Sequence, residues 1–569
     1  MRRARLACAA LVLPIFAARA AAQRPASPFS CDGKVISSID ITPHDPSFLA
    51  VPKYLRRLAR GVGLLHTTST KETIKRFLIL DVEQRCTERG RAESERILRL
   101  QPFLADATVR AVPDEAGGVR LDIETIDEIP TVLDVHFRDR RPSELRFGNG
   151  NVGGQGLYLA ASVERGFAYR TGAGVHAIAY RVGGEPYTVE LTAVRSPLGG
   201  ELTFAIGHTF LTALQRSAWH AGISDVDRYL FFKTPGNEPL SLDVRRRFWD
   251  IGGVRRVGLG RRVAFVGALI THEDVTPAGD FVVVSDSGLV APGPHDVPSN
   301  DSAYRNLRWN AVAGVRALSF MTVRGFDALS ARQDVAVGAQ LGALAGRAMP
   351  RFSGSDDDVL VSADFYAGIG SPTSFVASRV EGEARHDRRV GDWDSMVGSG
   401  RLAWYVKPDV THVVIAGVEF GAGRRQRVPF QLTLGDRQGG VRGYSASRDA
   451  GAVRAVARLE QRWSIGGLTR HDALGIASFV DAGRVWAGDA QFGVNGAVKF
   501  GVGVGLLAAF PPQSQRLWRV DVVVPVSPDP YARWEVRLTG SWTRTFWREP
   551  DDVARGRSGA APSTIFTWP

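Results

Sequence analysis

An arginine and an aspartate, each set among glycines, are the residues of this chain whose types and spacing suggest a specific contact. Arg442 lies in Gly439–Tyr444, which reads Gly-Gly-Val-Arg-Gly-Tyr and is typical of a tight loop. Asp481 lies in Phe479–Gly483, which reads Phe-Val-Asp-Ala-Gly and is typical of a strand. Because residues two apart on a strand share a face, Phe479 and Asp481 point the same way. We expect an ion pair between a loop tip and a sheet wall.

Further residues belong to the same candidate site, because a packed guanidinium must be paired. Glu460 is a second candidate carboxylate, on a strand face shared with Arg458 and Arg462. Gly443 permits a sharp turn beside the arginine, and the aromatic residues of the two motifs can pack on the guanidinium plane. The alternative is an ordinary surface turn with a solvated arginine. The candidate site, here called the loop latch, comprises Arg442, Gly443, Tyr444, Phe479, Asp481 and Glu460.

Patterns that carry catalysis are weak or missing. Gly148–Gly153 matches a dinucleotide fingerprint by letter, but Leu157–Val163 alternates like a strand where that motif requires a helix. Gly398–Gly400 lacks the flanking pattern of a nucleophile elbow. The 11 histidines show no metal-ligand spacing, and neither a P-loop nor a His-Glu-x-x-His motif is present. We expect no enzymatic activity, no cofactor and no metal.

The N-terminal residues 1–22 resemble a secretory signal peptide. Arginines at positions 2, 3 and 5 precede a short apolar run, and three alanines follow before Gln23. An exported chain whose arginines are spread rather than clustered does not suggest a nucleic-acid partner, and contacts to anionic lipid headgroups explain the net charge of +12. After cleavage only Cys31 and Cys86 remain, so the sequence allows either a disulfide or two free thiols.

Residues 33–128 differ from the rest of the chain. Lys34–Ile41 reads as a strand, and helical segments are expected over 52–65, from Ser69 to Leu80, and over 92–100. Two strands, Thr108–Val112 and Val119–Thr125, follow. We therefore predict a small α+β domain ordered strand, helices, strand, strand.

From residue 130 to residue 547 the pattern has period two. Residues 518, 520, 522 and 524 are apolar and alternate with Arg519 and Asp521, and roughly 20 such segments can be drawn. No segment other than the N-terminal one approaches the about 18 apolar residues of a membrane helix. Because only a closed barrel satisfies backbone hydrogen bonds in lipid, we predict an all-β transmembrane barrel. Residues 273–308 and 424–452 read as long extracellular loops, and 548–569 as a polar tail of unexplained role.

The paired motifs resemble the BamA–TamA superfamily of outer-membrane assembly and translocation proteins, the bacterial surface antigens. In that family a Val-Arg-Gly-Phe/Tyr loop tip folds back onto a Phe-x-Asp-x-Gly strand. The resemblance implies a barrel of about 16 antiparallel strands, and Glu93–Leu104 is similar to the second helix of a periplasmic POTRA domain. Gly150–Gly156 resembles the entry to the first barrel strand, so the seam is expected between Gly156–Val163 and Trp534–Trp547.

By this resemblance the chain assists insertion or translocation of proteins at the bacterial outer membrane, with its N-terminal domain in the periplasm. Its partners would be membrane lipids, client outer-membrane or secreted polypeptides, and periplasmic or lipoprotein components. The alternative is a secretion pore for a dedicated partner, or a solute channel, without insertase activity. A barrel associated with an enzyme on another chain is a third possibility.

Overall fold

The computed structural model of the chain describes residues 29–46, 67–115, 117–138, 141–164, 172–183, 187–212, 214–236, 240–258, 262–285, 290–293, 303–353, 356–435, 439–469, 471–542, 547 and 549–557. The signal peptide expected over 1–22 and the helix expected over 52–65 lie outside these residues.

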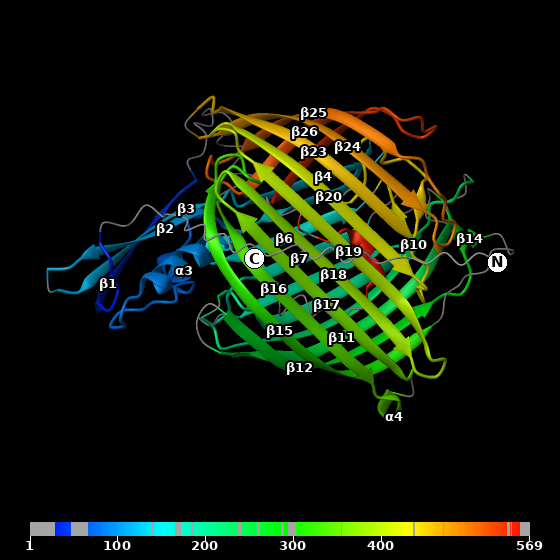
Figure 1. Cartoon of the computed structure of the whole chain (residues 1–569), viewed down its shortest axis with the longest axis horizontal. Helices are drawn as coiled ribbons and strands as arrows, with labels where there is room; N and C mark the ends of the chain where they lie inside the picture. Colours follow the sequence, from blue (N-terminus) through cyan, green and yellow to red (C-terminus); the bar gives the residue numbers. More distant parts are fainter. Residues whose placement is uncertain are drawn as a thin grey trace.

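The chain forms a wide β-barrel with a small α+β domain at one end, drawn in blue on the left of Figure 1. The domain contains β1 (Ile36–His44), α2 (Lys71–Lys75), α3 (Glu88–Arg99), β2 (Leu104–Pro113) and β3 (Val119–Asp127). This is the order that the sequence predicts. The three strands pair in the order β1-β3-β2, parallel for β1 with β3 and antiparallel for β3 with β2.

Threonine side chains begin α2 and α3, the two helices in the described part of the domain. The hydroxyl of Thr70 accepts a hydrogen bond from the amide of Thr73, and that of Thr87 accepts one from Gly90, so orphan amides of the first turn are satisfied. The expected start at Ser69 is one residue early. Apolar side chains of both helices and the sheet then form one core, which includes Ile74, Leu98 and Ile123.

The barrel wall is antiparallel throughout and closes on itself. The wall consists of 20 strands among the described residues, namely the nine strands β4 to β12, the six strands β15 to β20 and the five strands β23 to β27. Their bounds are β4 Thr131–Arg138, β5 Arg141–Asn149, β6 Leu157–Glu164, β7 Gly172–Ala179, β8 Thr188–Ser196, β9 Gly199–His208, β10 Ser217–Phe231, β11 Leu240–Val257, β12 Arg262–Pro277, β15 Tyr304–Arg324, β16 Arg332–Ala348, β17 Asp358–Gly370, β18 Ser374–Asp387, β19 Asp392–Val406, β20 His412–Arg424, β23 Val453–Gly466, β24 Ala473–Trp486, β25 Lys499–Ala509, β26 Arg516–Pro525 and β27 Glu535–Trp542.

The count and the seam differ from the expectation. The wall has more than 16 strands because β4 to β9 are only 8 to 10 residues long, so the same length of chain yields more of them. The last strand, β27, neighbours β4 rather than β6, so the seam begins at Thr131 and not near Gly156. Of the expected strand Trp534–Trp547, the described strand β27 covers Glu535–Trp542, and Trp547 itself is not in a strand.

The two long loops are partly regular. Strand β12 extends to Pro277, β15 begins at Tyr304, and the short strands β13 (Val282–Val284) and β14 (Val290–Pro292) lie between them. The second loop carries the two-residue strands β21 (Leu432–Thr433) and β22 (Ala450–Gly451). Short helices occur at η1 (Val152–Gly154), α4 (Pro350–Ser353) and α5 (Asp551–Gly556).

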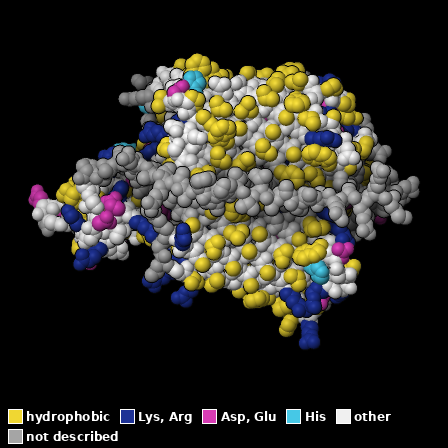
Figure 2. All heavy atoms as spheres, viewed as in Figure 1, with side chains coloured by type: hydrophobic (Ala, Val, Ile, Leu, Met, Phe, Trp, Pro, Cys, Tyr) yellow, Lys and Arg dark blue, Asp and Glu magenta, His cyan; other side chains and the backbone are white. Residues whose placement is uncertain are grey.

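The predicted alternation along the strands separates an apolar exterior from a charged interior. On β26, Val520, Val522 and Val524 are exposed, whereas Asp521 and Val523 are buried. On the face of the barrel that Figure 2 shows, apolar side chains accordingly make up much of the outer surface of the described strands. Within the described part of the chain, none of the helices has the length and apolar character needed to cross a membrane.

Candidate functional site in the barrel lumen

The loop between β20 and β23 packs against the inner wall of the barrel. Its strands β21 and β22 pair, and the amide of Val441 donates to the carbonyl of Leu434 at 2.8 Å. Val441 and Tyr444 are buried in one cluster with Val456 of β23 and Val485 of β24. The loop tip is therefore held by the wall strands that carry the predicted carboxylates.

Arg442 meets Asp481 in a bidentate contact. Its Nε lies 2.7 Å from one carboxylate oxygen and its Nη2 2.7 Å from the other, while its backbone amide donates at 3.2 Å. The guanidinium carbon is 3.4 Å from the centre of the Phe479 ring. Asp481 is fully buried and the Arg442 side chain is 13% exposed. Such a two-pronged, stacked contact fixes both the position and the orientation of the loop tip.

Glu460 connects this contact to two further strands. It accepts from Arg442 Nη1 at 3.0 Å, from Arg462 at 2.6 Å, and from both terminal nitrogens of Arg519 at 2.9 Å. Arg519 also contacts Asp521 at 2.7 Å. The result is a continuous network from the loop to β23, β24 and β26. Sequence reasoning missed Arg519 and Asp521 as members, although their alternation with the apolar residues of β26 places both on the inner face.

Gly443 and Tyr444 position the loop tip but do not contact the charged groups of the ion pair. Gly443 adopts a φ of +91°, and a Cβ there would lie 3.3 Å from Val523 and 3.4 Å from Pro525, so both conformation and space favour glycine. Tyr444 does not stack on the guanidinium as expected. Its hydroxyl lies 2.9 Å from the carbonyl of Phe500 in β25 and 3.1 Å from the carbonyl of Ser527 in the loop after β26. Tyr444 thus anchors the loop tip to β25 and to the end of β26.

Residues 549–557 of the polar tail lie in the lumen, where α5 appears as the red helix inside the barrel in Figure 1. Asp552 forms an ion pair with Arg454 of β23, and both side chains are buried. Arg454 Nη1 contacts one carboxylate oxygen of Asp552, and Nη2 lies 3.1 Å from the other. The fully buried Val553 packs on Phe430 and Leu432 of the loop. The tail thus touches both the wall and the loop that carries the latch.

The end of the described tail is held by β18, which β19 and β20 separate from β23 in the wall. Arg557 lies 2.6 Å from Glu381 and 3.5 Å from Glu383, both on β18, and 3.3 Å from Glu549 of the tail itself. Because three carboxylates surround one guanidinium, this end of the tail is anchored electrostatically.

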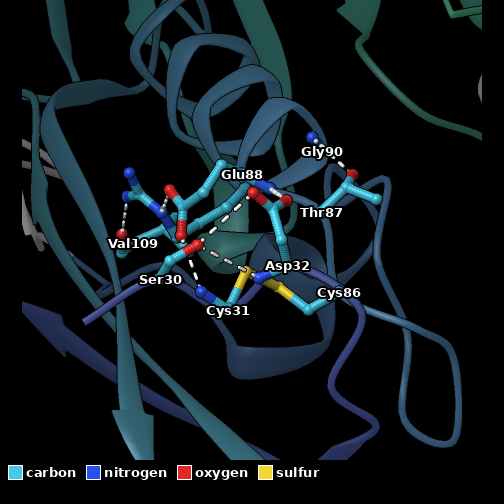
Figure 3. The surroundings of a disulfide bond; sticks show 9 residues. Ser30, Cys31, Asp32, Cys86, Thr87, Glu88, Gly90 and Val109 are labelled. Atoms are coloured by element: carbon cyan, nitrogen blue, oxygen red, sulfur yellow. Dashed lines mark hydrogen bonds and ion pairs between the residues drawn. A yellow bond between two sulfur atoms is a disulfide. The ribbon is translucent and has the colours of Figure 1, made fainter.

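Cys31 and Cys86 form a disulfide in the α+β domain, at an S–S distance of 2.06 Å. Figure 3 shows it beside the first turn of α3, where Glu88 accepts from the amide of Cys31 and its own amide donates to Asp32. The bridge therefore ties the chain before β1 to the start of α3.

The α+β domain docks on the turns of the barrel through buried polar contacts. Arg99 lies 2.9 Å from Asp334, and Arg332 lies 2.8 Å from Asp106. Glu128 accepts from Ser514 at 2.7 Å, and burial raises the pKa of Glu128 to about 7. A carboxyl of this kind is favoured in its protonated form when the domain is docked.

The glycine-rich segment before β6 is part of the same interface. Asn151 donates to the hydroxyl of Ser69, and the carbonyl of Gly154 accepts from Thr70 at 3.0 Å. A Cβ on Gly154 would lie 2.2 Å from the carbonyl oxygen of Thr68, so only glycine permits this approach. The segment expected to lead into the first barrel strand instead receives the N-terminal domain.

No family model and no curated protein matches the chain. Among solved structures, BamA from Haemophilus ducreyi lacking POTRA domains 1–3 aligns over 89% of this chain and 84% of its own, with 12% identity and a TM-score of 0.35. CdiB from Escherichia coli aligns over 91% of this chain and 92% of its own, with 10% identity and a TM-score of 0.35. CdiB from Acinetobacter baumannii aligns over 88% of this chain and 72% of its own, with 10% identity and a TM-score of 0.34. At these scores the barrel assignment rests on the strand pairing of the chain itself.

Proposed function

We propose that the chain is an outer-membrane barrel of the BamA–TamA type that assists insertion or translocation of polypeptides. The observation that carries the proposal is the loop latch, in which the Val-Arg-Gly-Tyr tip docks on the Phe-x-Asp-x-Gly strand inside a closed barrel. This contact joins two motifs that are far apart in the sequence and that the family resemblance pairs. We assign the N-terminal domain as a single POTRA module in the periplasm.

The apolar exterior supports a membrane location. Large side chains on several outer strand faces are more than half exposed, including Ile223, Val315 and Val536. A soluble protein rarely presents so much contiguous apolar surface, whereas a barrel in lipid requires it. The edge strands β1 and β2 of the domain would then offer clients a site for strand addition.

The tail in the lumen favours a second candidate, a secretion pore. A polypeptide that passes through the lumen requires α5 to leave, so the ion pairs of Asp552 and Arg557 would act as a closure. An insertase that works at the seam requires no such movement.

Site-specific photocrosslinking in cells separates the two candidates. A crosslinker at Val536, outside and next to the seam, should capture outer-membrane polypeptides if the protein is an insertase. One at Ser362, which lines the lumen beside Arg557, should capture a secreted polypeptide if it is a pore. Val315 on the far wall is the matched exterior control. Polypeptide adducts at none of the test positions, or equal capture at Val315, would contradict both candidates.

A further inference from the structure

A groove with a volume of about 1210 Å³ crosses the outer surface of the barrel over β15 to β20. Its floor contains a transverse row of small residues, in which each residue is the register partner of the next. The row consists of Ala313, Ala343, Ala363, Gly382, Gly398 and Ala422. A second row beside it includes Ala345 and Ala384. Because neighbouring strands lie about 4.8 Å apart, the floor is about 24 Å long.

Large apolar side chains border the groove on the side of the α+β domain. The next transverse row on the same strand faces contains residues that are 40% to 56% exposed, namely Val315, Leu341, Phe365, Val380 and Phe420. Residues two apart on a strand share a face, so a large residue is followed on each of these faces by alanine or glycine. The outer surface is therefore lower along the floor by most of a side chain.

The opposite side of the groove carries two tryptophans and a cation. Trp309, Arg347, His386 and Trp393 belong to one transverse row of register partners. The indoles are 50% and 41% exposed. Strand β16 begins at Arg332, which contacts the α+β domain, so its other end and this side of the groove face away from that domain. Membrane barrels concentrate such aromatic side chains at the level of the lipid headgroups.

Arg347 and Arg388 present accessible guanidinium groups on this side. Arg388 follows His386 by two residues, just after the end of β18. Asp357 lies 3.7 Å from Arg347 and 3.5 Å from Arg388, and in the described part of the chain it is the one carboxylate within ion-pair distance of either. The two arginine side chains are 60% and 40% exposed. Basic side chains gather in Figure 2 at the strand tips where Figure 1 places α4.

We propose that the groove binds a membrane lipid that carries a phosphate group, with an acyl chain on the floor and the phosphate on Arg347 and Arg388. Guanidinium groups match phosphate oxygens and form charge-assisted hydrogen bonds with them. The floor is longer than the about 15 Å of hydrocarbon in one leaflet, so it accommodates an acyl chain over its full depth. Chain and floor gain dispersion contacts that a gap would forfeit.

Charge selects a lipid over a protein as the occupant. A transmembrane helix would also pack on alanine and glycine, but it offers no phosphate to the two arginines. The inference rests on the membrane location within the proposed function and requires neither insertion nor translocation of polypeptides. Lipid binding is measured on the purified protein, so its failure in a chain that fractionates with the outer membrane would leave the proposed function intact.

Native mass spectrometry of the full chain in neutral detergent tests the proposal with two lipids that differ only in the phosphate. Dioleoyl phosphatidic acid is the probe and dioleoylglycerol the reference. We expect phosphatidic acid to bind more tightly than dioleoylglycerol. Ala343→Trp should raise the Kd of both lipids several-fold, because the indole fills the floor. Ala339→Trp, the same change on the same face of β16 but outside the groove, should change neither.

A second set of variants separates the headgroup from the chain. Combining Arg347→Gln with Arg388→Gln should raise the Kd of phosphatidic acid about ten-fold and leave that of dioleoylglycerol unchanged. Arg324→Gln, which changes an exposed arginine at the domain end of β15, should affect neither lipid. All of these variants change exposed side chains, and unaltered heat-modifiable gel mobility checks that each barrel is folded.

Three results would overturn the proposal. The first is equal affinity for the two lipids in the wild-type protein. The second is an equal effect of Ala343→Trp and Ala339→Trp. The third is a dimer that Ala343→Trp dissociates, because the groove would then belong to a second copy of the chain.

Discussion

Replacing Arg442 by alanine should destabilise the barrel more than replacing its partner Asp481. Among the described residues, Arg442 is the only one that hydrogen-bonds to Asp481, which is fully buried. Its loss leaves a buried carboxylate without a hydrogen-bond partner, which costs about 3–5 kcal/mol. In Asp481→Ala, Arg442 keeps Glu460 at 3.0 Å and partial exposure, so we expect about 1.5–3 kcal/mol, the value of hydrogen bonds to a charged group.

The double variant should cost less than the sum of the singles by about 0.5–3 kcal/mol, since both changes remove one contact. The measurement is the midpoint of heat-modifiable gel mobility at one heating rate, because barrel unfolding is under kinetic control. Arg424→Ala, exposed at the base of the loop, is the control. Arg448 is less suitable because it donates to the carbonyl of Gly236 and lies over Tyr531. Strict additivity, or a larger loss in Asp481→Ala than in Arg442→Ala, would refute the reasoning.

Four further predictions follow from the domain, its interface and the tail. Burial raises the pKa of Glu128 from 4.5 to about 7. The contribution of this group to docking is therefore complete below about pH 4.5, and up to about 3 kcal/mol of it is lost as the pH rises through 7. The difference in melting midpoint between wild type and Glu128→Gln, measured at pH 5 and at pH 8, checks this, with the exposed Glu124→Gln as control. Alkylation without reductant should modify neither Cys31 nor Cys86, and two reactive thiols would disprove the bridge. Asp552→Ala, or removal of residues 548–569, should raise the conductance of the barrel in planar bilayers, and unchanged conductance would mean that the tail does not close the lumen. Protease added to intact cells should spare the N-terminal domain, and cleavage there with the outer membrane sealed would reverse the orientation.

The sequence predicts those parts of the site in which a side chain has few possible ways to be buried. An arginine and an aspartate that both lie inside a barrel must each find an opposite charge, and the structure brings Arg442 and Asp481 together. The order of the α+β domain follows in the same way from local spacing. Tyr444 differs because an aromatic ring can be buried in several ways, and its hydroxyl bonds to the carbonyls of Phe500 and Ser527 rather than lying over the guanidinium.

The strand number and the tail depend on information that local patterns lack. Alternation identifies a strand but not its neighbour, so the short strands β4 to β9 cannot be counted into a closed wall from the sequence. Asp552 and its partner Arg454 are 98 residues apart, and α5 is only six residues long. Neither has a periodicity that reveals the contact. The inner-face alternation of β26 did carry a usable signal for Arg519.

The position of the tail makes its docking independent of the closure of the ring. Arg454 lies on β23 and the carboxylates that hold Arg557 lie on β18, and β19 and β20 are the strands between these two in the order of the wall. The tail follows β27, the strand that completes the ring against β4. The strands that bind the tail can therefore stand in place before β27 meets β4. An unclosed barrel would already hold residues 549–557 inside, out of reach of the proteases that cleave exposed termini.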